Sequence, residues 1–98
     1  NSMKQETIDM ILKFRDDRDW KQFHNPKDLA LSITLEAAEL LETIQWDEEN
    51  IDMRAVESEL ADVLMYALSI CIDYDMDVEN IIRNKINNVY ERYPEVKK

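Results

Sequence analysis

Glycine is absent from the sequence, and only two prolines, Pro26 and Pro94, interrupt its 98 residues. Sheet proteins rely on glycine-rich turns between their strands, so this absence disfavours a fold built on β-sheets. Residues that favour helices, among them alanine, leucine, isoleucine, glutamate, lysine and methionine, are abundant. The composition therefore predicts an all-α fold, and the length favours a single domain with one compact core.

Cysteine, long hydrophobic runs and positive charge are also scarce. Cys71 is the single cysteine and stands among apolar residues, so we expect a core thiol in a reducing compartment, the cytoplasm. No apolar run of about 18 residues predicts a membrane span, and no signal peptide is expected. The net charge of −10 repels nucleic-acid backbones, although a polyphosphate remains a compatible ligand where divalent cations intervene.

Four helical segments are expected from the spacing of apolar residues and from capping signals. They cover approximately residues 4–18, 26–45 and 51–74, and residue 78 up to the residues before Pro94. Asn25 followed by Pro26 is a helix start, and Asn50 and Asp77 are the expected caps of the two later helices. We expect one domain over residues 4–94, with a tag remnant and start at residues 1–3 and a tail at residues 95–98.

Two acidic pairs stand out within the central helices. Glu36 and Glu39 share one narrow arc of the second helix, with apolar residues on both sides. Glu59 and Asp62 share a stripe of the third helix that continues through Tyr66, and the rest of that helix is largely apolar. Such an apolar helix is expected to be central and mostly buried, and burying unpaired carboxylates is costly. Four converging carboxylates therefore predict a shared cation, and a hard divalent ion such as Mg²⁺ suits oxygen ligands.

A second interpretation treats the same acids as ordinary solvent-exposed faces of a helical bundle. A single Glu-x-x-Glu pair favours that interpretation, whereas two pairs in narrow slots on neighbouring apolar helices favour a metal site. Asp73 ends the stripe and is expected either to close the acidic row or to cap the turn before Asp77. A di-iron carboxylate bundle is disfavoured, because it needs Glu-x-x-His pairs and His24 is the single histidine.

The motif Glu36-x-x-Glu39 followed by Glu59-x-x-Asp62 resembles the signature of the all-α nucleotide pyrophosphohydrolases. This group includes MazG proteins, dimeric dUTPases and phosphoribosyl-ATP pyrophosphohydrolase. The segments RDWKQFHNPKDLALS, LEAAELLETIQW, ELADVLMYAL and RYP are similar to the single-domain MazG-like branch that includes dCTP pyrophosphatase. The resemblance extends over about residues 8–94. It implies a four-helix bundle completed by oligomerisation, as a dimer or as a tetramer built from two dimers.

The resemblance also implies hydrolysis of nucleoside triphosphates to monophosphate and pyrophosphate with Mg²⁺, or with Mn²⁺ in its place. The implied metal ligands are Glu36, Glu39, Glu59 and Asp62. A water held among them would attack the α-phosphorus, and Glu36 or Glu39 would take its proton. The expected enzyme is a house-cleaning hydrolase that prefers deoxynucleotides such as dCTP. The alternatives are a related dUTPase or phosphoribosyl-ATP pyrophosphohydrolase activity, or a non-enzymatic helical oligomerisation module.

Further positions that match the family are candidates for substrate binding. They are Trp20, His24, Trp46, Tyr66, Lys85 and Arg92. The tryptophans would stack on the base, the tyrosine would contact the sugar or a metal ligand, and the basic residues of the last helix would bind the β- and γ-phosphates. The alternative for the tryptophans is a place at the ends of the core, and for the basic residues a solvated face. The family commonly has asparagine four residues after Lys85, where this chain has Val89.

Overall fold

The computed structural model describes residues 3–17 and 25–92, and the regular secondary structure in these ranges is helical. The helices are α1 (Gln5–Asp17), α2 (Pro26–Glu42), α3 (Met53–Asp73) and α4 (Val78–Arg92). The prediction of an all-α fold with four helices is therefore confirmed. Among the described residues, no helix is both long and apolar enough to cross a membrane.

Two of the predicted helix starts are confirmed by their caps. Asn25 has extended backbone angles, and its side-chain oxygen accepts a hydrogen bond from the Asp28 N–H at 2.8 Å. Pro26 takes the first helical position, where no N–H is needed. At the start of α4, an oxygen of Asp77 accepts from the Asn80 N–H at 3.1 Å. Both caps satisfy backbone donors that a helix start leaves without a partner.

The predicted cap of α3 is wrong, because Asp52 takes that position instead of Asn50. An Asp52 oxygen accepts hydrogen bonds from the N–H groups of Arg54 and Ala55, at 3.0 and 3.4 Å. The backbone N–H and the side-chain amide of Asn50 donate to the Asp47 carboxylate, at 3.1 and 3.3 Å. Asn50 therefore closes a turn in the α2–α3 connection, and the helix begins at Met53. Both residue types can cap, so composition alone does not choose between them.

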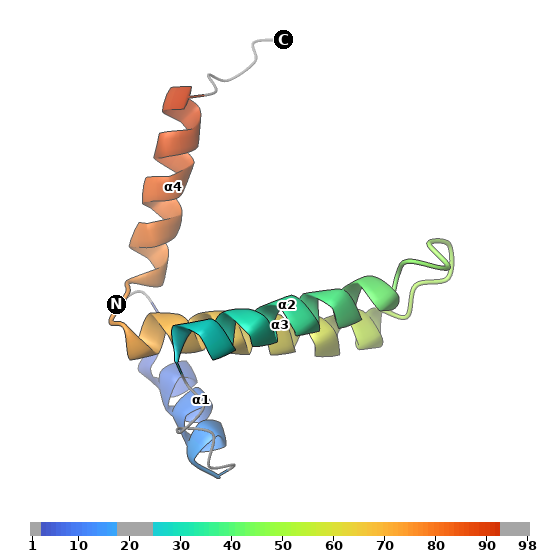
Figure 1. Ribbon diagram of the computed structural model, residues 1–98, viewed down its shortest axis with the longest axis horizontal. Coiled ribbons are helices and arrows are strands. Elements are labelled where there is room, and N and C mark those ends of the chain that lie inside the picture. The colour runs from blue at the N-terminus through green and yellow to red at the C-terminus, as the bar shows by residue number, and fades with distance from the viewer. Residues whose placement is uncertain (1–2, 18–24, 93–98) are drawn as a thin grey trace.

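The central feature of the fold is a hairpin of α2 and α3, which run antiparallel and side by side (Figure 1). Helix α1 crosses α3 near the end of α3 that leads into α4. All three helices contribute buried apolar side chains; they are Ile8 and Ile11 of α1, Leu29 of α2 and Cys71 of α3. The expectation of a buried core thiol at Cys71 is thus confirmed.

Helix α1 is attached to α3 by a part-buried ion pair that sequence reasoning missed. The guanidinium of Arg15 donates to both carboxylate oxygens of Asp73, at 2.8 and 3.1 Å. Arg15 stands on the apolar face of α1, with Ile11 one turn and Ile8 two turns before it. Asp73 therefore binds α1, a role that neither expectation for it included.

Helix α4 leaves the C-terminal end of α3 and points away from the hairpin (Figure 1). Asp75 makes the turn with a positive φ of 51°, and the Met76 N–H donates to the Cys71 carbonyl at 2.8 Å, a common helix termination. None of the residues of α4 is buried.

The apolar sequence of α3 predicts that this helix is mostly buried. In the structure it is not, because Leu60 and Leu64 are 42 % and 51 % exposed. The prediction for α3 is therefore wrong for the single chain.

Candidate metal centre

Three of the four predicted metal ligands converge between the two helices of the hairpin. Glu36 comes from α2, and Glu59 and Asp62 come from one turn of α3. One carboxylate oxygen of each lies within 4.8 Å of the others, and all three residues are half-buried. The spacing of three in α3 places both of its carboxylates on the side that faces α2. The prediction that acidic residues of the two helices converge is therefore confirmed for Glu36, Glu59 and Asp62.

Glu39 lies one turn after Glu36 and completes the acidic environment from the side of α2. It is more exposed than the other three acids. It nevertheless influences both Glu36 and Glu59 through hydrogen bonding and charge. The structure thus gives three close oxygens and a fourth carboxylate beside them.

The electrostatics of the cluster favour protonation when no cation is present. Burial raises the pKa of Glu36 from 4.5 to about 7, assisted by a hydrogen bond with Glu39 and by the negative charges around it. Burial and Glu39 also raise the pKa of Glu59, although hydrogen bonding with Glu36 acts in the opposite direction. Carboxylates whose charges are mutually unfavourable gain most from a divalent cation between them.

Two oxygens in this cluster fit such a cation. Oε2 of Glu36 and Oε2 of Glu59 are buried and have no hydrogen-bond partner in the part of the chain that the structure describes. Buried polar atoms normally have a partner, and an exception calls for an explanation such as an ion. Oxygen donors of this kind suit Mg²⁺ or Mn²⁺ better than softer metals. Glu36, Glu59 and Asp62 would hold the ion, with Glu39 placed to join them.

Tyr66 stands one turn beyond Asp62 on the same face of α3. Burial raises the pKa of its hydroxyl, and the negative charges of Glu36 and Asp62 raise it further. The phenol therefore stays protonated beside the acids. From this position it can donate a hydrogen bond to a carboxylate or to a bound ligand.

The other predicted substrate-binding residues do not join the cluster within one chain. Trp46 follows α2 and is 83 % exposed. Lys85 and Arg92 are exposed on α4, the helix that points away from the hairpin (Figure 1). Trp20 and His24 lie outside the described residues. The structure therefore brings together the acids and Tyr66.

Comparison with known proteins identifies the family. A profile of the MazG-like family matches residues 31–98, which include both acidic pairs. The chain belongs to the MazG-like family. The crystal structure of a pyrophosphatase from Archaeoglobus fulgidus superposes on it with a TM-score of 0.82, at 36 % identity, over 93 % of this chain and 92 % of that one.

Sequence comparison with curated proteins agrees with this family assignment. The chain is 31 % identical to dCTP pyrophosphatase 1 of Mus musculus and 33 % identical to dCTP pyrophosphatase 1 of Bos taurus, each over 91 residues. These matches cover 84 % of this chain and 54 % of the relatives. The chain thus spans about half the length of the curated relatives it matches.

Proposed function

We propose that this MazG-like protein hydrolyses nucleoside triphosphates to monophosphate and pyrophosphate with the help of Mg²⁺. The observation that carries the proposal is the pair of buried oxygens on Glu36 of α2 and Glu59 of α3, which have no hydrogen-bond partner among the described residues and belong to one acidic cluster. A solvated acidic surface would not leave such atoms without a partner. The names of the relatives, a pyrophosphatase and dCTP pyrophosphatase 1, support the reaction class.

The charge of the substrate explains why an acidic site suits this reaction. A bound Mg²⁺ ion would neutralise phosphate oxygens and acidify a water molecule. Glu36, Glu59 and Asp62 would fix its place from two rigid helices, with Glu39 beside them. A chain of net charge −10 can then accept an anionic substrate at a point where its own charge is compensated.

The protein residues have distinct tasks in the proposed reaction. Water attacks the α-phosphorus, the bond from that phosphorus to the oxygen bridging to the β-phosphorus breaks, and pyrophosphate leaves with that oxygen. Glu36 or Glu39 accepts the proton of the water. Tyr66 would contact the sugar or steady a carboxylate.

The substrate is proposed to be a deoxynucleotide, with dCTP among those preferred. Trp20, His24 and Trp46 would contact the base, and Lys85 and Arg92 would contact the β- and γ-phosphates. An aromatic ring as exposed as that of Trp46 gains most by stacking on a base.

Product analysis over a panel of triphosphates tests the reaction class and the base together. The purified chain is incubated with each of the common dNTPs and NTPs, with phosphoribosyl-ATP and with dUTP, in Mg²⁺ or in EDTA. The expected products are monophosphate and pyrophosphate in equal amounts, from one or a few deoxynucleotides and only with Mg²⁺. Release of diphosphate and inorganic phosphate, or no cleavage of any triphosphate, would contradict the proposal. The second result would favour a non-enzymatic assembly module.

A further inference from the structure

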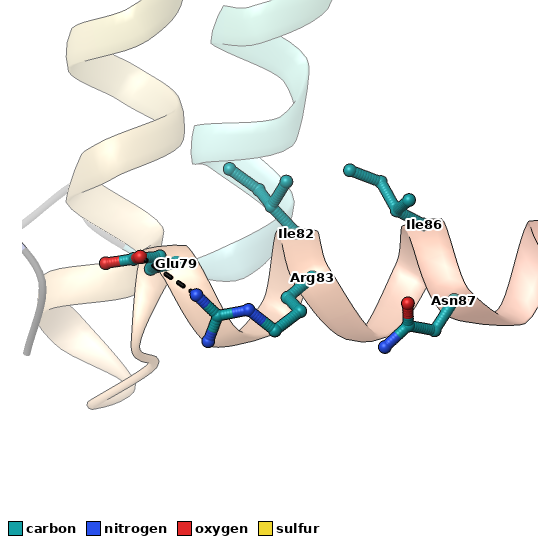
Figure 2. Close-up of a pocket in the computed structure, with 5 residues that line it drawn as sticks. All are labelled: Glu79, Ile82, Arg83, Ile86 and Asn87. Atoms are coloured by element: carbon teal, nitrogen blue, oxygen red, sulfur yellow. Dashed lines mark hydrogen bonds and ion pairs between the residues drawn. The ribbon is translucent and has the colours of Figure 1, made fainter.

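We draw no further inference here: the strongest candidate, the apolar face of α4 from which Ile82 and Ile86 project one turn apart (Figure 2), carries nothing, because nothing in the residues that the structure describes shows what covers it.

Discussion

Arg15 of α1 and Asp73 of α3 form a two-pronged ion pair, with Nη1 at 2.8 Å from one carboxylate oxygen and Nη2 at 3.1 Å from the other. Arg15 is 6 % exposed, and the two residues are 58 positions apart in sequence. Parallel donors from a planar guanidinium fix both distance and orientation. This pair therefore holds α1 against the C-terminal end of α3.

Arg15→Ala is expected to lower the free energy of unfolding by about 2–3 kcal/mol, because it removes two charge-assisted hydrogen bonds between a buried guanidinium and the part-buried Asp73 carboxylate. Chemical denaturation of the wild type and the variant measures the difference. The control is Lys13→Ala, which breaks the exposed pair with Asp17 on the same helix and is expected to cost less than about 0.5 kcal/mol. Equal costs for the two variants would show that the Arg15–Asp73 pair adds no more stability than an exposed pair.

Asp52→Ala is expected to destabilise the protein by about 1 kcal/mol, because it removes the cap that accepts two backbone donors at the start of α3. Asn50→Ala removes only bonds within the exposed turn to Asp47 and is expected to cost clearly less. Thermal unfolding of both variants under one buffer condition decides the order. A larger effect at Asn50 would mean that α3 begins earlier than the structure places it.

The stability of the metal-free protein is expected to fall as pH rises from about 5 to about 8. The pKa of Glu36 is raised from 4.5 to about 7 in the folded state, so the folded protein holds this proton in a range where the unfolded chain has lost it. Stability then decreases with pH between those two values and levels off above 7. The raised pKa of Glu59 acts in the same direction.

Melting temperatures in EDTA at pH 5.5 and pH 8 measure this dependence. Glu36→Gln is expected to reduce it, because the amide does not titrate. Addition of Mg²⁺ at pH 8 is expected to raise the melting temperature of the wild type and to raise that of Glu36→Gln much less. A wild-type melting temperature that increases with pH in EDTA would contradict the electrostatics described for the cluster.

The sequence predicted those parts of the fold that depend on neighbouring residues. Two helix starts were predicted from local signals, Asn25 with Pro26 and Asp77. A capping side chain accepts a hydrogen bond from a backbone N–H only a few positions away, so a short stretch of sequence is enough to identify it. The acidic pairs were equally readable, because a spacing of three places two side chains over one helical turn. The side chains of Asn50 and Asp52 can both cap a helix. The start of α3 therefore depends on which of them is used in the turn of the α2–α3 connection, and that residue is Asn50.

Sequence patterns of this local kind do not predict contacts between residues that are far apart in the chain. The Arg15–Asp73 pair joins residues from the first and third helices, and no periodicity links them. The burial expected for α3 was wrong for the single chain, because an apolar pattern indicates that a helix favours burial but does not show which residues would cover it. Leu60 and Leu64 remain about half exposed in the single chain.

The most direct test is the initial rate of pyrophosphate release from dCTP over a range of Mg²⁺ concentrations, for the wild type, Glu59→Gln and Glu57→Gln. Glu57 lies on the same helix, is exposed and is outside the acidic cluster, so its variant makes the same chemical change away from the site. The expected result is a Mg²⁺-dependent rate for the wild type and Glu57→Gln, and a loss of about 100-fold or more for Glu59→Gln. If Glu59→Gln matches Glu57→Gln at every Mg²⁺ concentration, the acids between α2 and α3 are not the metal centre of this protein.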